Sequence, residues 1–163
     1  MITAFIEHRG ELRALAATLG NLVAAAVEGV VLDAFVLVGR EDGEVRELAE
    51  AAGADLLVSV GAGDLAGRGR GEWLLFLESG AAFEEGWTEA ARAWGGSHSA
   101  PARFRRGRLS VLRRLWPPPR PLEAGLLIRR DMFRASARPG ADLAAVLPRR
   151  RGRIEATLLP ARR

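Results

Sequence analysis

The side chains that this chain offers for chemistry are carboxylates, serines, arginines and two histidines. None of the 163 residues is cysteine, which excludes disulfide frameworks, thiolate nucleophiles, zinc ribbons and iron–sulfur clusters. All 24 basic residues are arginine, so a phosphate-binding-loop lysine and Schiff-base chemistry are excluded as well. Because His8 and His98 are the only histidines, a metal site built from several histidines cannot form.

Glu78 is the carboxylate whose position most suggests a ligand site, because it directly follows the apolar segment 73–77. At the carboxyl end of a parallel strand, its oxygens would face the ligand crevice and could bind a divalent cation, Mg²⁺ or Mn²⁺. One carboxylate alone is a poor metal site, since Mg²⁺ is usually held by one or two carboxylates together with substrate phosphates. An exposed acid at the start of a turn is the plainer alternative, and the sequence leaves both open.

Two further patterns resemble known sites but have the wrong spacing. Gly61-x-Gly63-x-x-Ala66 follows a predicted strand, as a dinucleotide fingerprint does. More glycines follow, and the next strand begins at Trp73, which leaves no room for the helix that holds a pyrophosphate; we therefore predict a flexible surface loop. His98 lies between two serines, but a catalytic serine and histidine usually come from distant loops, so we expect no catalytic pair there.

Charge is distributed unevenly along the chain. Residues 1–100 carry 16 acids and 7 arginines, a net charge of −9, whereas residues 101–163 carry 17 arginines and 4 acids, a net of +13. This predicts a basic half that faces an anion such as phosphate, nucleic acid or lipid headgroups. The small number of aromatic residues near the arginines argues against nucleic acid, which is bound on stacking platforms.

The segment 109–116 combines leucines with basic and aromatic residues, namely Arg108, Arg113, Arg114 and Trp116 at or beside it. We predict a basic amphipathic helix here, of the kind that lies on anionic lipid. A core-facing helix with an arginine-rich solvent face is the alternative. No signal segment is visible, and the longest uncharged run, 14–27, is too short to span a bilayer, so we expect a cytoplasmic protein, or one peripheral to a membrane.

The elements that would position these residues alternate between strand and helix. Apolar residues at three- and four-residue spacing predict a helix over 11–27, and the continuous apolar run 34–38 predicts a strand covered on both faces. The alternation predicts one α/β domain over 1–163 with a parallel sheet, whose ligands bind beyond the carboxyl ends of the strands. The other expected elements are strands at 1–6, 56–60, 73–77, around 104, 126–128 and 154–159, helices at 41–52, 84–94, 131–135 and 142–147, and a loop at 95–99.

Several segments resemble glycosyltransferase family 2 of bacteria. The stretch RGRGEWLLFLE resembles the family's ARGEWLLFLxAD pattern, and segments 35–44, 123–133 and 152–163 resemble further parts of the family in the same order. The resemblance covers nearly the whole chain. It implies a GT-A fold, which is a Rossmann-like three-layer arrangement around a mostly parallel central sheet. It also implies transfer of a sugar from a nucleotide-sugar donor, with residues 1–96 as the nucleotide-binding half and 97–163 as the acceptor half.

The resemblance also implies roles for individual residues. Glu78 would help to hold a metal or the donor diphosphate, and Asp42 and Gly43 would line the nucleotide pocket. Glu123 stands where the family often has an acid. Asp142 would be the general base that deprotonates the acceptor hydroxyl.

This chain departs from the family at several functional positions. The metal-binding Asp-x-Asp reads Glu78-Ser79-Gly80, the base-contacting aspartate is hydrophobic near Leu37, and Glu7 replaces a proline. A lost metal costs several kcal/mol of transition-state stabilisation. Two functions therefore remain open. The chain is either a nucleotide-sugar glycosyltransferase, competent or weakened to inactivity, or a non-catalytic scaffold whose arginine-rich half docks on anionic lipid or a partner protein.

Overall fold

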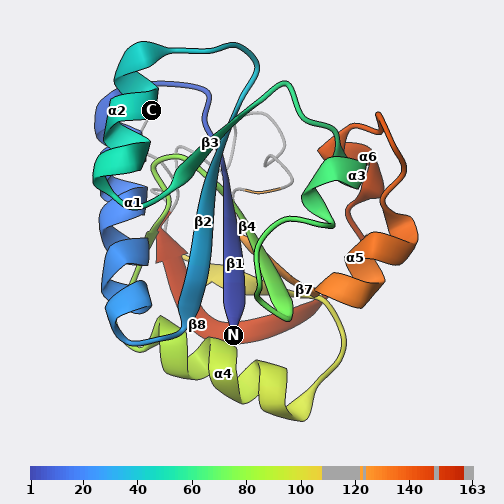
Figure 1. Ribbon diagram of the computed structural model, residues 1–163. Coiled ribbons are helices and arrows are strands. Elements are labelled where there is room, and N and C mark those ends of the chain that lie inside the picture. Colours follow the sequence, from blue (N-terminus) through green and yellow to red (C-terminus); the bar gives the residue numbers. More distant parts are fainter. Residues whose placement is uncertain (108–121, 123, 149–150, 160–163) are drawn as a thin grey trace, which may run out of the picture.

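The first half of the chain forms a parallel sheet from alternating strands and helices. The computed structural model describes residues 1–107, 122, 124–148 and 151–159 (Figure 1). Strand β1 (Ile2–Glu7) lies between β2 (Val31–Val38) and β4 (Trp73–Glu78), parallel to both, and β3 (Asp55–Val58) pairs in parallel with β2. Helices α1 (Leu12–Val27) and α2 (Gly43–Ala51) make the crossovers. Because parallel strands end at one edge, Glu7 lies directly opposite Glu78 on β4.

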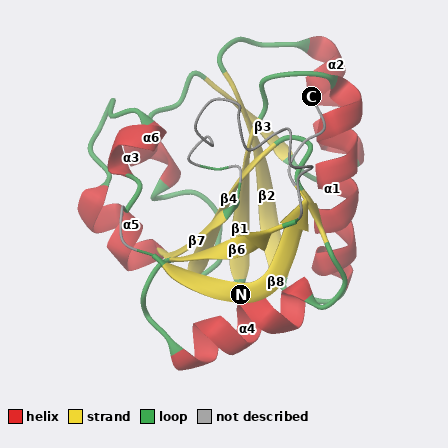
Figure 2. Ribbon diagram, turned by 180° about the vertical axis from the view of Figure 1, so that it is seen from behind, coloured by secondary structure: helices red, strands yellow, loops and turns green. Residues whose placement is uncertain are grey.

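The second half extends the same sheet with strands of both directions. Strand β7 (Leu126–Arg129) pairs antiparallel with β4, β6 (Ala102–Arg106) pairs antiparallel with β7, and β8 (Gly152–Leu159) runs parallel to β6. The short β5 (Ala82–Phe83) closes the order β3-β2-β1-β4-β7-β6-β8-β5. Since two antiparallel pairings separate β6 from β4, β6 points toward the same edge as β4. Figure 2 shows β6 and β8 curving across the lower part of the sheet, beside α4 (Trp87–Ser97).

Helices cover both faces of this sheet, which confirms the predicted three layers. Alternate residues of β1 face opposite ways: Ala4 and Ile6 pack toward α1 and α2, whereas Phe5 packs toward the other face. On that second face, the rings of Phe5 and Phe76 stack with centroids 5.1 Å apart, and Phe133 follows at 4.9 Å from Phe76. Phe133 lies on α5 (Arg130–Ser136), which covers this face with α3 (Ala62–Leu65) and α6 (Leu143–Val146).

The predicted strands and helices are confirmed in type, with two corrections in the region of α4. The helix expected over 84–94 begins only at Trp87, because residues 82–83 pair with β8 and Gly86 turns the chain in a left-handed conformation (φ +82°). It continues to Ser97, through the glycines expected to form a loop, where Gly95 packs against Trp73. The neighbouring Ser97 hydroxyl lies 2.8 Å from Nδ1 of His98, whose ring stacks on Trp94.

Helices α1 and α2 begin one and two residues later than predicted, respectively, and they end at or within one residue of the predicted ends. Gly53, just after α2, has the left-handed backbone (φ +70°) of a helix C-terminal cap. Residues Arg108, Arg113, Arg114 and Trp116 of the expected basic helix lie outside the described residues. Of the helices that the structure describes, none has the length and apolar character needed to cross a bilayer.

The glycine-rich segment 61–71 is a packed connection, not a flexible loop. One helical turn, α3, occupies its start, although we expected no helix there. Near its end, a Cβ atom at Gly71 would lie 2.3 Å from the backbone nitrogen of Thr3, so only glycine fits against β1. This contact lies where β1 and β4 begin, at the edge opposite Glu78. Gly69 and Gly71 therefore serve close packing against β1.

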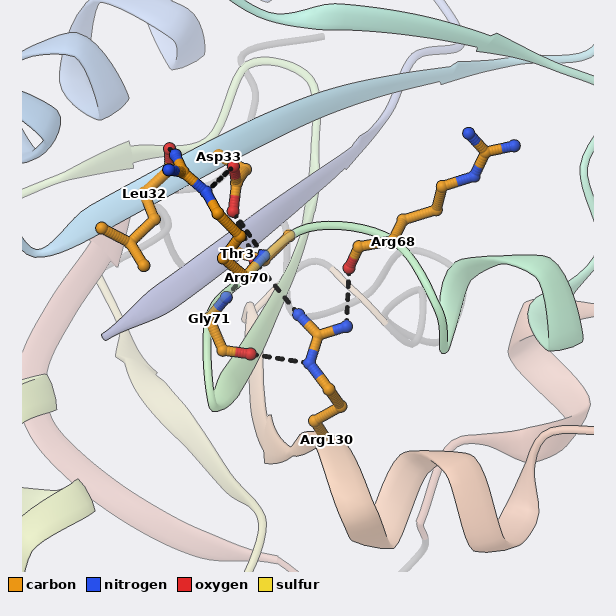
Figure 3. A network of polar contacts seen from close by, with 7 residues as sticks. All are labelled: Thr3, Leu32, Asp33, Arg68, Arg70, Gly71 and Arg130. Carbon is orange, nitrogen blue, oxygen red and sulfur yellow. Dashed lines mark hydrogen bonds and ion pairs between the residues drawn. The ribbon is translucent and has the colours of Figure 1, made fainter.

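Arginine and aspartate side chains hold this connection in place (Figure 3). The Arg130 guanidinium donates to the carbonyl oxygens of Gly71 (2.7 Å), Arg68 (2.6 Å) and Ala66 (3.1 Å), and to the buried hydroxyl of Thr3 (3.2 Å). Four separate acceptors thus converge on one side chain from α5. The sequence showed no sign of this arrangement, because it joins residues far apart in the chain.

Asp33, at the start of β2, anchors the same connection from the other side. Burial of its carboxyl opposes ionisation, but hydrogen bonds from the backbone N–H (2.7 Å) and guanidinium (3.0 Å) of Arg70, and from Thr3, outweigh burial and lower the pKa of Asp33. The carboxylate therefore stays charged and bound at neutral pH.

Candidate functional site

The carboxyl ends of β1, β2 and β4 meet at one edge of the sheet, called here the carboxyl rim. Two adjoining pockets open at this rim, with volumes of about 320 and 240 Å³. Both are lined by Glu7, Arg9, Asp142 and Leu143. The first extends toward the ends of β2 and β3, and the second toward Glu78 at the end of β4.

Arg9 lies among the acids of the rim. Its guanidinium forms an ion pair of 2.5 Å with Glu7. The hydrogen bond and charge of Glu7 raise the pKa of Arg9, and the charges of Glu78 and Asp142 act in the same direction. The structure thus brings together Glu78 and Asp142, two of the four acids proposed from the sequence, around the largely exposed cation of Arg9.

Asp142 reaches the rim because its chain segment packs over the start of α3. The Ala62 N–H donates to the carbonyl of Ala141 (3.0 Å), and a Cβ at Gly63 would lie 3.0 Å from the backbone of Pro139. The glycine at position 63 thus permits close approach of two backbones. Asp142 also caps α6, accepting the Ala144 N–H at 3.2 Å through Oδ1.

Asp42 and Gly43 lie at the start of α2. The Asp42 carboxylate accepts the N–H groups of Glu44 (3.1 Å) and Val45 (3.3 Å), as an N-terminal cap, and Gly43 is the first helical residue. Asp42 lies near the rim, since its charge acts on His8. Glu123 lies outside the described residues.

His8 lines the larger pocket with Ser59. Burial lowers the pKa of His8, and the charge of Asp42 opposes that effect only in part. Its Nδ1 is buried and has no hydrogen-bond partner among the described residues. Ser59 has a left-handed backbone (φ +51°), which is uncommon for a residue other than glycine, and its hydroxyl donates to the carbonyl of Gly39 (2.6 Å). His8 thus contributes a neutral imidazole to the pocket lining, and Ser59 contributes a backbone segment that its hydrogen bond to Gly39 holds in place.

Sequence reasoning assigned no site role to Glu7, His8 and Arg9, although residues 7–10 lie at the carboxyl end of a predicted strand, where the ligands of a parallel sheet bind. Ser59 follows β3 in the same way. Its left-handed backbone could not be read from the sequence.

The donor set does not fit a metal held by protein ligands alone. Within the part of the chain that the structure describes, no three histidine or acidic side chains are grouped closely enough to hold a metal ion. The Glu7 carboxylate is paired with Arg9, and a cation beside this guanidinium would be repelled by it. The Asp-x-Asp pattern that the resemblance implies is thus not reproduced at Glu78-Ser79-Gly80.

No protein-family model matches the sequence, and no curated protein matches it. Similar folds occur among solved structures. TarS of S. aureus, in complex with UDP-GlcNAc, matches with a TM-score of 0.66 at 12% identity, over 100% of this chain and 59% of that one. The mannosyltransferase PcManGT from Pyrobaculum calidifontis, in complex with GDP-Man and Mn²⁺, matches with a TM-score of 0.64 at 14% identity, over 98% and 56%.

A third similar structure is glucosyl-3-phosphoglycerate synthase from Mycobacterium tuberculosis, in complex with Mn²⁺, UDP and glucosyl-3-phosphoglycerate. It has a TM-score of 0.55 at 14% identity, over 80% of this chain and 57% of that one. The chain thus spans less than two thirds of each of these structures. At such identities the likeness establishes the fold alone: this chain has the mixed α/β GT-A fold of nucleotide-sugar glycosyltransferases.

Proposed function

We propose that the carboxyl rim binds a nucleotide-sugar and transfers its sugar to an acceptor hydroxyl, as in glycosyltransferase family 2. The observation that carries this proposal is the convergence of Glu78, Asp142 and Arg9 on one pocket at the end of β4. The similar solved structures, which bind UDP-GlcNAc or GDP-Man, support the class of donor.

In this reaction Asp142 is the general base. Its Oδ1 caps α6, and its Oδ2 accepts the proton of the acceptor hydroxyl. The hydroxyl oxygen then bonds to the anomeric carbon of the sugar, and the bond from that carbon to the diphosphate oxygen breaks. The nucleoside diphosphate leaves with the electron pair. A base in this role must come within hydrogen-bond reach of the hydroxyl, about 2.6–3.2 Å.

Arg9 is the residue proposed to stabilise the departing diphosphate. A preorganised cation aimed at developing negative charge lowers the barrier most in a site that excludes water. Glu7 holds the guanidinium in place and Glu78 faces it across the pocket. Because Glu7, Glu78 and Asp142 outnumber this one arginine, the pocket remains net negative, and we expect weak donor binding. None of these steps depends on a metal.

Binding and turnover can be tested with a panel of UDP- and GDP-sugars at millimolar concentration, each with and without Mg²⁺ or Mn²⁺. We expect one donor to raise the melting temperature and to be hydrolysed or transferred slowly. Asp142→Asn keeps a good helix cap but removes the base, so it should lower turnover about 10²–10⁴-fold while donor binding persists. Asp131→Asn, an exposed aspartate on α5, is the matched control.

The donor panel also separates this proposal from the scaffold alternative. If no donor shifts the melting temperature, the proposal fails and only the fold remains. If donors bind but Asp142→Asn and Asp131→Asn turn over equally fast, the base is elsewhere.

A further inference from the structure

Four arginines line one open cleft that the proposed donor site does not use. This arginine cleft, of about 580 Å³, lies on β6 and β8 and is lined by Arg103, Phe104, Arg105, Ala124, Arg151, Gly152 and Arg153. Among the residues that the structure describes, no acid lines this cleft. The cleft therefore concentrates positive charge in a chain whose formal net charge is only +4.

Strand geometry explains why the arginines share one face. Arg103 lies directly opposite Arg153 across the parallel β6–β8 pair. Side chains two residues apart on a strand point the same way, which places Arg103 and Arg105 on one face of β6, while Arg151 directly precedes β8. Phe104 and Ile154, which alternate with these arginines, are buried in the core on the α4 side.

This arrangement places several positive charges close together. Like charges directly opposite on neighbouring strands are destabilising. Arg105 pairs with Glu155 at 3.2 Å, but both side chains are more than half exposed, and such surface pairs contribute little. Arg151 donates through Nε to the carbonyl of Pro148, while its Nη1 is buried without a hydrogen-bond partner among the described residues.

We propose that the arginine cleft binds a phosphate monoester group. Planar guanidinium forks match phosphate oxygens with paired hydrogen bonds, and four arginines in one cleft suit a group with two negative charges. The cleft and the carboxyl rim have lining residues that are close in the chain: Ala124 lines the cleft, and Leu122 lines the pocket that contains Glu78 and Asp142.

This position assigns the phosphate to the acceptor molecule. The acceptor would be anchored by its phosphate in the arginine cleft while its hydroxyl reaches Asp142. Assignment to an acceptor rests on the proposed function, whereas phosphate binding to the cleft does not.

The test is phosphate binding by the full chain in a phosphate-free buffer. Inorganic phosphate and glycerol phosphate are titrated by calorimetry and by thermal shift. The double variant Arg105→Gln/Arg153→Gln removes two exposed guanidinium groups from the cleft, and we expect binding to weaken at least tenfold. Arg13→Gln/Arg92→Gln, an equal charge change on α1 and α4, should bind as the unmodified chain does. Glu155→Gln removes the competing acid and should tighten binding about two- to fivefold.

Three results would overturn the proposal. The first is that phosphate does not raise the melting temperature of the unmodified chain. Binding could survive in Arg105→Gln/Arg153→Gln and disappear in Arg9→Gln, which would place the phosphate at the carboxyl rim. The third result is that the unmodified chain binds vesicles of anionic lipid, and Arg105→Gln/Arg153→Gln does not, while neither soluble phosphate binds. That result would assign the cleft to a membrane surface. Because no nucleotide-sugar is present, the first and third results do not bear on the donor site, whereas loss of binding in Arg9→Gln would show that the cation of the donor site binds phosphate.

Discussion

Replacing Arg130 with methionine should destabilise this fold more than any other exchange of a single arginine on α5. Methionine keeps an apolar stem of similar length but removes the guanidinium. The loss takes away four hydrogen bonds, to the carbonyls of Gly71, Arg68 and Ala66 and to the Thr3 hydroxyl. Those bonds hold the connection that leads into β4, so their loss should also destabilise the start of this central strand.

The magnitude follows from the number and surroundings of these bonds. A hydrogen bond from a charged donor contributes about 1.5–3 kcal/mol, but water can replace the exposed contact to Arg68. Burial lowers the pKa of Arg130, an effect strengthened by the charge of Arg134 and opposed by Asp33, so keeping this charge buried has its own cost. We expect a net loss of about 3 kcal/mol of unfolding free energy, which corresponds to a fall of about 6–12 °C in melting temperature.

Equilibrium unfolding in urea, followed by the fluorescence of the buried Trp73, measures this loss. The control is Arg134→Met on the same helix, since Arg134 is exposed and makes one long contact of 3.5 Å to the carbonyl of Ala66. It should cost less than about 0.5 kcal/mol. If both variants lose equal stability, the Arg130 network does not hold the connection and the reasoning is wrong.

Two further predictions concern the edges of the sheet. Gly71→Ala should cost about 1–3 kcal/mol, because its Cβ would lie 2.3 Å from a β1 backbone atom, whereas Gly67→Ala, with nothing within 4 Å, should be close to neutral in urea unfolding. Burial lowers the pKa of His8 in the folded chain. As the pH drops below about 6.5, the unfolded chain therefore takes up the proton first, and the free energy of unfolding decreases. His8→Gln should remove that part of the pH dependence of stability, and an unchanged pH profile in this variant would refute the pKa shift.

The arginine excess of the second half had two open interpretations in the sequence, and the structure divides the arginines between different roles. Arg130 is a structural donor to backbone carbonyls. Arg103 and Arg153 face each other in an open cleft. Composition alone cannot separate these roles, because arginine serves in both. The role of an individual arginine depends on which carbonyl oxygens and which charges lie near its guanidinium in the folded chain.

Much of the first half of the fold follows from the sequence because its interactions are local or periodic. The apolar run 34–38 predicted a buried part of β2, and periodic apolar residues predicted α2 to within two residues at each end. Such patterns work because helix caps, turns and strand alternation depend on residues a few positions apart. The acids that follow strands were predicted to lie at one edge for the same reason, since parallel strands end together.

Tertiary structure alone decided what those patterns leave open. The pairing of residues 82–83 with β8 shortened the start of α4, and the packing of the segment before α6 onto α3 brought Asp142 to Glu78 and Arg9. These contacts join residues far apart in the chain, so no local spacing encodes them. They are selected by the burial of two apolar faces and by backbone groups that need hydrogen-bond partners.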